Sequence, residues 1–222
     1  MALIISNAYL SQAQMTDNAQ YIADYLINKG WTRNAVAGIL GNMQRESTLN
    51  PGLWESLIYG NMSGGYGLVQ WTPATGYTSW ADARGYPWGN NYGNTTAYFN
   101  GQLECILWEV ANNQQWIATS SFNFSFSAFT RSAESPEYLA EAFMRNYERP
   151  GVLALEERRQ NARYWFENLT YGSSAVIKNA VEWAIAIAND NSHGYSQDNR
   201  WGPDYDCSSL RSEERRVGKE CR

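Results

Sequence analysis

Apolar residues recur at the spacing of an α-helix near the start of the chain. The pattern i, i+3, i+4, i+7 predicts one buried helix face, made of Ala19, Ile22, Ala23 and Leu26. Asp17 and Gln20 have the spacing of a capping box, so we expect the helix to begin at Asp17. Gly30 is the type of residue that closes a helix, and it gives the expected end.

A second helix is expected directly afterwards, with Thr32 as its N-cap. The same spacing recurs in its apolar face, made of Val36, Ile39, Leu40 and Met43. Glu46 stands three residues after Met43 and therefore continues this inward face with a carboxyl group. The Asn-Pro-Gly sequence at 50–52 indicates that the helix has ended there.

The rest of the chain predicts further helices and one strand-bearing segment. Helical spacing recurs in 103–110, 162–169 and 176–187, and Ser-Pro-Glu at 135–137 is typical of a helix start. Residues 61–73 are glycine-rich and then strand-like, which predicts a short hairpin or an extended turn. The expected fold class is α+β, predominantly helical, with a small β-hairpin lobe.

A polar break separates a larger part of the chain from a smaller one. The break is Tyr-Gly-Ser-Ser at 171–174, after the last helix face of the larger part. We therefore expect a domain over residues 1–170, a linker over 171–174 and a fragment of a second domain over 175–210.

The last residues have the sequence of a sequencing artefact. Residues 211–221, Arg-Ser-Glu-Glu-Arg-Arg-Val-Gly-Lys-Glu-Cys, equal the first-frame translation of a widely used short-read sequencing adapter. We expect 211–222 not to be native, and the authentic coding sequence to be interrupted after Leu210.

Composition excludes several classes of function. The net charge of −5 provides no basic surface for phosphates, so no nucleic-acid partner is expected. No apolar run is long enough to span a bilayer, and the first residues lack the basic segment of a signal peptide. Three cysteines make no disulfide framework, and the single histidine, His193, excludes a His-rich metal site. We expect no membrane partner, no metal and no cofactor.

Aromatic residues are abundant, with 10 Trp, 15 Tyr and 7 Phe. Tyr86, Trp88 and Tyr92 fall in a glycine- and asparagine-rich stretch that is expected to be a loop. Rings exposed there would suit sugars, which have an apolar face and hydroxyl edges. The alternative is that the rings only fill the core.

Glu46 is the strongest candidate for a catalytic residue. At the C-terminal end of an inward helix face, loss of solvent and the helix dipole both favour the protonated carboxyl. A glycosidase needs such a proton donor, and replacing the group by Gln is then not expected to lower stability. The alternative is an ordinary exposed glutamate at a helix end, which spacing alone does not exclude.

Two motifs carry a resemblance to a known family. Gly-Asn-Met-Gln-Arg-Glu-Ser-Thr-Leu-Asn-Pro at 41–51 and Gly-Tyr-Gly-Leu-Val-Gln-Trp-Thr-Pro at 65–73 resemble the phage tail lysozyme family, the lysozyme halves of bifunctional tail-tip peptidoglycan hydrolases. The resemblance covers about residues 5–170 and includes Tyr-Glu-Arg-Pro at 147–150. More distantly, the motifs look like goose-type lysozymes and soluble lytic transglycosylases.

The resemblance implies a lysozyme-like domain with Glu46 as its catalytic acid. It also implies a sugar cleft that is lined by Tyr66, Gly67, Gln70 and Trp71. Hydrolysis usually needs a second carboxylate, as nucleophile or as base for water. The candidates, among which spacing does not choose, are Glu55, Asp82 and Glu148. If none stands opposite Glu46, a transglycosylase, in which the sugar's own hydroxyl attacks, becomes the better interpretation.

A second resemblance lies near the end of the chain. Residues 201–210, Trp-Gly-Pro-Asp-Tyr-Asp-Cys-Ser-Ser-Leu, resemble the nucleophile segment of papain-like cell-wall peptidases and amidases. This implies that Cys207 is a thiolate nucleophile at a helix start. Such a nucleophile needs a His base, which in that family lies downstream, so Cys207 is expected to be stranded without it.

The leading hypothesis is a muramidase that cleaves β-1,4 bonds between N-acetylmuramic acid and N-acetylglucosamine. We expect bacterial peptidoglycan as substrate, phage tail proteins as partners and the virion tail tip as location. The alternatives are a lytic transglycosylase acting on the same bond, a non-catalytic glycan-binding tail module and an internal structural tail protein.

Overall fold

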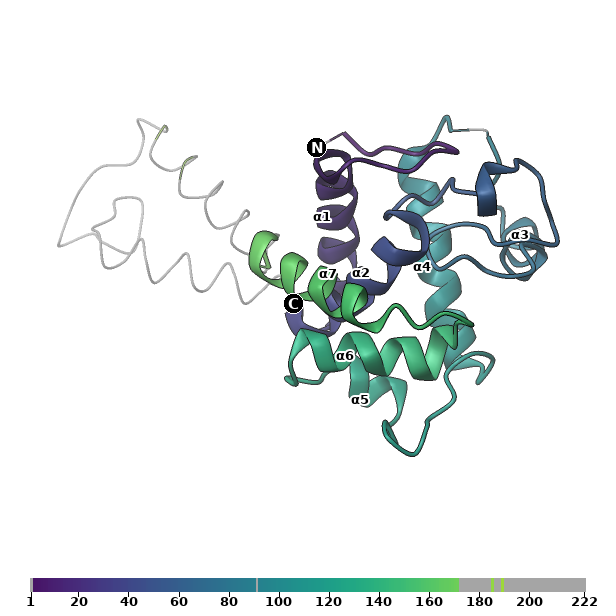
Figure 1. Ribbon diagram of the computed structural model, residues 1–222. Helices are drawn as coiled ribbons and strands as arrows, with labels where there is room; N and C mark the ends of the chain where they lie inside the picture. Colours follow the sequence, from purple (N-terminus) through teal and green to yellow (C-terminus); the bar gives the residue numbers. More distant parts are fainter. Residues whose placement is uncertain (1, 91, 172–184, 186–188, 190–222) are drawn as a thin grey trace. The chain divides into compact units, whose positions relative to one another are not determined.

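Helix α2 (Arg33–Ser47) is the element around which the others pack in the computed structural model, which describes residues 2–90, 92–171, 185 and 189 (Figure 1). Its contacts are most extensive with α7 (Leu155–Asn168) and α6 (Pro136–Phe143). Because small residues alternate with Val36, Ile39 and Leu40, nearly every face of α2 is buried. The predicted apolar face is therefore only part of a helix that is enclosed on most sides.

The chain divides into two units, Met1–Thr170 and Tyr171–Arg222, and the elements below belong to the first. The remaining elements of that unit are α1 (Gln12–Asn28), a 3-10 turn (Glu55–Leu57), α3 (Thr75–Asp82), α4 (Thr95–Ala111), α5 (Phe126–Thr130) and a π-helix, η2 (Met144–Glu148). Figure 1 shows α5 and α6 at one side of α2 and the short α3 at another. Of the helix predicted around 176–187, only Ile185 lies within the described residues, where it is helical and exposed.

Local capping explains where the helices begin. The side chains of Thr32 and Ser135 accept hydrogen bonds from backbone N–H groups of the first turns of α2 and α6, which confirms both predicted starts. The predicted start of α1 at Asp17 is wrong. Ser11 and Gln14 form the capping box with the same spacing, and α1 begins at Gln12.

The predicted β-hairpin lobe is absent from the part of the chain that the structure describes. Tyr66 and Trp71 exchange two backbone hydrogen bonds, of 3.0 and 3.2 Å, and Tyr66 also bridges to Trp54, but neither pairing extends. Gly67 and Gln70 have positive φ values of 83° and 49°, so the chain turns between the paired residues instead of running on as strands. The fold is predominantly helical, as predicted, with a tight loop in place of the hairpin.

Many aromatic rings of the described residues pack against one another in the interior. A row of rings runs through the α3 region, in which Trp71 stacks on Tyr77 at 4.9 Å and Trp80 stacks on Tyr86 at 5.6 Å. Trp88 is half-buried and donates its indole N–H to Asp82. Core packing therefore accounts for Trp71, Tyr77 and Trp80, which are buried, whereas Tyr86 and Trp88 are only half-buried.

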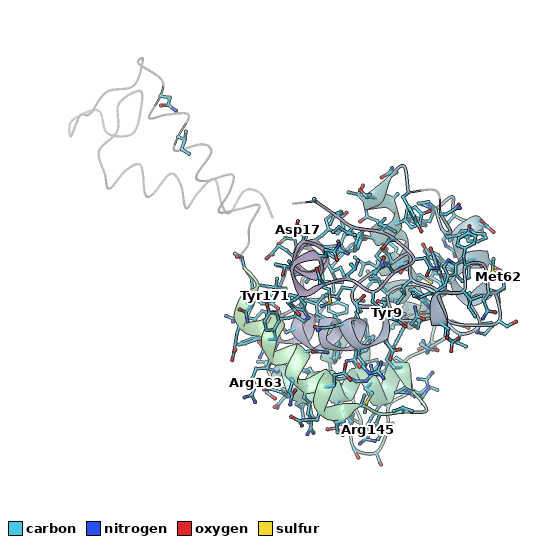
Figure 2. The ribbon with its side chains drawn as sticks, turned by 45° about the horizontal axis from the view of Figure 1, so that its top comes forward. Tyr9, Asp17, Met62, Arg145, Arg163 and Tyr171 are labelled. Atoms are coloured by element: carbon cyan, nitrogen blue, oxygen red, sulfur yellow. The ribbon has the colours of Figure 1, made fainter. Side chains whose placement is uncertain are left out.

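The side chains fill the space between the helices, and charged groups such as Arg145 and Arg163 lie at the outer edge (Figure 2). Within the described residues, none of the helices combines the length and the apolar character that crossing a membrane requires.

Close approach of α2 to its neighbours depends on glycine. A Cβ atom on Gly41 would lie 2.5 Å from the backbone oxygen of Arg158 and 2.7 Å from the backbone nitrogen of Ala162, both in α7. One turn earlier, a Cβ on Gly38 would lie 2.9 Å from the Cβ of Leu139 in α6. These glycines let three helices meet with their backbones almost in contact.

We predict that Gly41→Ala destabilises the protein by about 1–3 kcal/mol, because the added methyl group pushes α7 away from α2. The control is Gly76→Ala in α3, where the nearest atom would be 3.9 Å from the new Cβ. That variant should stay within about 1 kcal/mol of the wild type. Denaturant unfolding of both variants checks the prediction, and an unchanged midpoint for Gly41→Ala would contradict it.

Candidate active site

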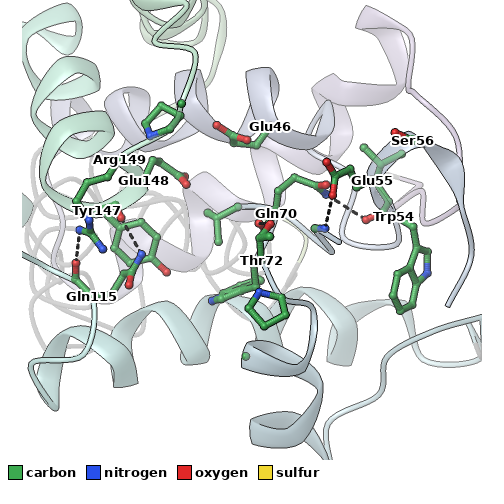
Figure 3. A pocket seen from close by; sticks show the side chains of 18 of the residues that line it. Glu46, Trp54, Glu55, Ser56, Gln70, Thr72, Gln115, Tyr147, Glu148 and Arg149 are labelled. Atoms are coloured by element: carbon green, nitrogen blue, oxygen red, sulfur yellow. Dashed lines mark hydrogen bonds between the residues drawn. The ribbon is translucent and has the colours of Figure 1, made fainter. Parts of the chain in front are cut away.

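A cleft of about 660 Å³ opens beside the C-terminal end of α2 (Figure 3). Its walls come from Glu46, from residues 53–56, from residues within 65–76, from Glu109 of α4 and from residues 147–151. Segments far apart in the sequence therefore meet in one concave site, which is the usual geometry of a ligand-binding site.

Glu46 lies in the last turn of α2, and its side chain is 19% exposed. Nη2 of Arg158 donates a hydrogen bond of 2.5 Å to its Oε1. Arg158 itself is 2% exposed. The sequence analysis considered only solvent loss and the helix dipole, whereas the structure also places a buried cation against this carboxyl group.

Arg158 is held in place by all three of its nitrogens. Besides the bond to Glu46, Nη1 donates to Oδ1 of Asn42 and Nε donates to the carbonyl of Leu153, each at 2.9 Å. Asn42 is buried and in turn donates to the carbonyls of Gly38 and Ala140. The guanidinium thus has one orientation, which is fixed by α2, α6 and α7 together.

Glu148 enters the cleft from the π-helix. The N–H of Arg149 bonds to the carbonyl of Met144 at 2.7 Å, so the turn contains one residue more than an α-helical turn. Such turns are frequent at functional sites. Glu46 and Glu148 both line the cleft, and both are labelled there in Figure 3.

Glu148 is half-buried, and the Oε1 atom of its carboxyl group is fully buried, with no hydrogen-bond partner among the described residues. Burial raises the pKa of Glu148 well above its ordinary value, and the negative charge of Glu46 raises it further. The charges of Arg158 and Arg149 act in the opposite direction, and that of Glu109 raises the pKa again. The charge of Glu46 therefore influences the protonation of Glu148.

Glu109 is a cleft carboxyl that the sequence analysis missed. It accepts a hydrogen bond of 2.9 Å from the indole N–H of Trp71 and another from the hydroxyl of Tyr147. Burial raises the pKa of Glu109, while these two hydrogen bonds lower it. The signal was available, because Gln102, Ile106 and Glu109 repeat on α4 the helical spacing that drew attention to Glu46.

The other predicted carboxylates differ in position. Glu55 is exposed at the cleft, where its Oε2 accepts a hydrogen bond of 2.9 Å from the N–H of Gly65. Asp82 lies on α3, binds Trp88 and is not among the residues that line the cleft. The structure therefore brings Glu46, Glu55 and Glu148 together and leaves Asp82 outside.

The predicted sugar-binding segment divides in a similar way. Gln70 and Trp71 line the cleft, and Gln70 donates its amide N–H groups to two backbone carbonyls. Tyr66 is buried, and its hydroxyl accepts a hydrogen bond from the N–H of Gly89. A Cβ at Gly67 would lie 2.6 Å from Oε1 of Gln102, so this glycine allows the loop to pack on α4. Tyr66 and Gly67 thus support the wall that Gln70 and Trp71 form.

In the described ranges, no three His, Cys, Asp or Glu side chains lie close enough to hold a metal ion. Cys105 is buried in α4 as a free thiol. Cys207 and His193 lie outside the described residues.

Comparison with known proteins places this site in a family. A model of the phage tail lysozyme family matches residues 17–169. The chain belongs to the phage tail lysozyme family. The matched part of this lysozyme domain includes all the cleft carboxyls, Glu46, Glu55, Glu109 and Glu148, together with Arg158.

One relative is a phage assembly protein. The chain is 50% identical over 172 residues to Morphogenesis protein 1 of Bacillus phage B103. The alignment covers 78% of this chain and 44% of the relative, so the lysozyme-family chain spans less than half of that protein's length.

We predict that Glu148→Gln raises the melting temperature at pH 8 and leaves it nearly unchanged at pH 4.5. The folded pKa of Glu148 lies above the unfolded value, so its contribution to stability is present at low pH and is lost as pH rises towards the folded pKa. A neutral amide avoids that loss, and each kcal/mol is worth about 2–4 °C in a domain of this size.

Thermal unfolding across pH 4.5–8 measures the effect. Glu134→Gln, at an exposed position, controls for the loss of one negative charge. A melting temperature for Glu148→Gln that follows the wild type at every pH would show that the buried carboxyl carries no penalty.

Proposed function

We propose that this chain cleaves the β-1,4 bond between N-acetylmuramic acid and N-acetylglucosamine in bacterial peptidoglycan, with Glu46 as general acid. The observation that carries the proposal is the pairing of Glu46 with a second, buried carboxyl, Glu148, in one cleft of a phage tail lysozyme domain. Two carboxyl groups flanking the scissile bond are the common requirement of glycoside hydrolysis.

The chemistry follows from the charge that develops in the sugar. Glu46 gives a proton to the glycosidic oxygen as the bond to the anomeric carbon breaks, and positive charge grows on the sugar ring. Water then attacks the anomeric carbon and loses a proton to a base. We propose Glu148 for that second role, because it interacts electrostatically with Glu46, whereas Glu55 is engaged with Gly65 and Asp82 lies outside the cleft.

The transglycosylase alternative has one observation in its favour. A buried Glu148 that keeps its proton is a poor base for water, and the sugar's own hydroxyl would then attack the anomeric carbon instead. The two products differ in their ends, because hydrolysis leaves a reducing muramic acid and transglycosylation leaves an anhydro end. Mass spectrometry of fragments released from purified walls distinguishes them, and we expect reducing ends.

Substrate binding would use the aromatic and amide groups of the cleft wall. Trp71 and Gln70 come from the tight loop, and Tyr9, which is 62% exposed, also lines the cleft. An indole or phenol ring offers an apolar face to a sugar. The polar edge of Trp71 is held by Glu109, which fixes the ring in the cleft wall.

We further propose that the domain acts at the virion tail tip, in contact with other tail proteins, and needs no metal or cofactor. The relative from phage B103 is named a morphogenesis protein, which agrees with a place in the particle. In a longer protein, Cys207 would serve as nucleophile of a second, papain-like peptidase or amidase domain, a proposal that rests on residues 201–210 alone.

We predict that Glu46→Gln reduces wall lysis by at least about 10³-fold, since general acid catalysis contributes about 10²–10⁴-fold and the leaving group is a poor alkoxide. Binding of a chitooligosaccharide should survive, because the loop that carries Gln70 and Trp71 is untouched. Stability should fall by about 1–3 kcal/mol, because buried Arg158 keeps a hydrogen-bond acceptor but loses its counter-charge.

Turbidity loss of purified walls, calorimetric sugar binding and thermal unfolding give the three readouts. Glu156→Gln, an exposed change on α7, is the control and should lyse walls at the wild-type rate. Full lysis by Glu46→Gln would move the acid elsewhere. A non-catalytic glycan-binding module would show sugar binding but no lysis even in the wild type.

A further inference from the structure

The contact between Arg158 and Glu46 uses only one oxygen of the carboxyl group. Nη2 of Arg158 bonds to Oε1 at 2.5 Å. Oε2 takes part in no hydrogen bond within the described part of the chain, and it is not among the buried unpartnered atoms. Since Glu46 lines the cleft, Oε2 is the oxygen that remains for a substrate.

The guanidinium cannot turn to engage both oxygens. Its Nε and Nη1 are committed to Leu153 and Asn42, and the side chain is almost completely buried. Asn42 is fixed by its own two hydrogen bonds to α2 and α6. The guanidinium group is planar, so fixing Nε and Nη1 by hydrogen bonds also fixes the direction of Nη2.

We propose that Arg158 is a positioning residue for proton donation by Glu46. By holding Oε1 as an acceptor, it leaves Oε2 as the only oxygen that can carry the transferable proton towards the cleft. This inference rests on the proposed function of Glu46 and deepens it.

The same contact stabilises the product of proton transfer. In the reacting complex the Oε2–H bond breaks and a new O–H bond forms on the glycosidic oxygen, which also takes the electron pair of the broken bond to the anomeric carbon. The electron pair of the Oε2–H bond stays on Glu46, which becomes a carboxylate beside Arg158. A fixed cation next to the site where negative charge develops lowers the barrier to that step.

Glu148 is the other carboxyl group of this arrangement. The charge of Glu46 raises the pKa of Glu148, and the charge of Arg158 lowers it. Glu109 and Arg149 add one charge of each sign from α4 and from the end of the π-helix. Arg158 differs from all of these groups because it alone, among the described residues, contacts Glu46 by a hydrogen bond.

The test compares substrates that differ in their need for an acid. Peptidoglycan has a poor leaving group, whereas a 2,4-dinitrophenyl β-glycoside of a muramic acid oligosaccharide has a leaving group that departs unprotonated. We expect Arg158→Met to lose about 10²-fold or more in kcat on peptidoglycan but less than about 10-fold on the aryl glycoside. We expect Glu46→Gln to show the same selective loss on peptidoglycan.

Arg163→Met is the matched control. Arg163 is on the same helix and also forms an ion pair with a glutamate, Glu137, but its side chain is 65% exposed at the outer edge of the molecule (Figure 2). Its rate on both substrates should equal that of the wild type. Arg158→Lys keeps the positive charge but lacks the paired N–H donors of the planar guanidinium. It should fold, and its rate on peptidoglycan should lie between those of Arg158→Met and the wild type.

Equal losses of Arg158→Met on both substrates would overturn the inference, since a structural disturbance harms both reactions alike. If Arg158→Met does not fold, the same comparison is made with Arg158→Lys: the loss of kcat on peptidoglycan is compared with the loss on the aryl glycoside. Should Glu46→Gln itself retain full lysis, the proposed function fails, and this outcome is distinct from failure of the role of Arg158.

Discussion

The near contact of α2 with α7 is the constraint on which the rest of the lysozyme domain depends. Gly41 has no side chain, so the backbone of α7 approaches α2 closely at Arg158 and Ala162. At this separation the side chain of Arg158 reaches both Glu46 and Asn42. The charge balance of the cleft is thus a consequence of helix packing, and a structural glycine serves the chemistry indirectly.

The three carboxyl groups Glu46, Glu109 and Glu148 at the cleft have different charged and hydrogen-bonding partners. Glu46 has a cation, Glu109 has two hydrogen-bond donors, and Glu148 has a buried oxygen with no donor among the described residues. Environments of this kind separate the protonation behaviour of neighbouring acids, which glycoside cleavage requires. The π-helix is the element that makes this possible, because its extra residue turns Glu148 inward at the end of α6.

Sequence patterns predicted the features that depend on neighbouring residues. The caps at Thr32 and Ser135 and the predominantly helical character follow from local rules, and both are confirmed. The start of α1 was predicted wrongly because two residue pairs, Ser11 with Gln14 and Asp17 with Gln20, have the spacing of a capping box, and the first pair forms it. The hairpin was wrong because alternation in so short a segment does not reveal that Gly67 and Gln70 adopt left-handed conformations.

The candidate site was predictable only in part, for the same reason. Glu46 and the 147–150 motif stood out as local signals, and both lie at the cleft. Arg158 is separated from Glu46 by 112 positions, and no periodicity connects them. Its partnership appears only once α2 and α7 are packed, so the sequence analysis named solvent loss and the helix dipole but not this counter-charge.

The N-terminal arm, residues 2–10, gives the domain a boundary that family comparison alone would misplace. The family match begins at residue 17, yet the backbone of the arm satisfies the side-chain amides of Asn18 and Asn50, both buried. Tyr9 of the same arm forms part of the cleft. A clone trimmed to the matched residues would therefore remove the backbone partners that the arm gives Asn18 and Asn50, together with the Tyr9 side of the cleft. A minimal lysozyme-family module is therefore better cut before the arm than after it.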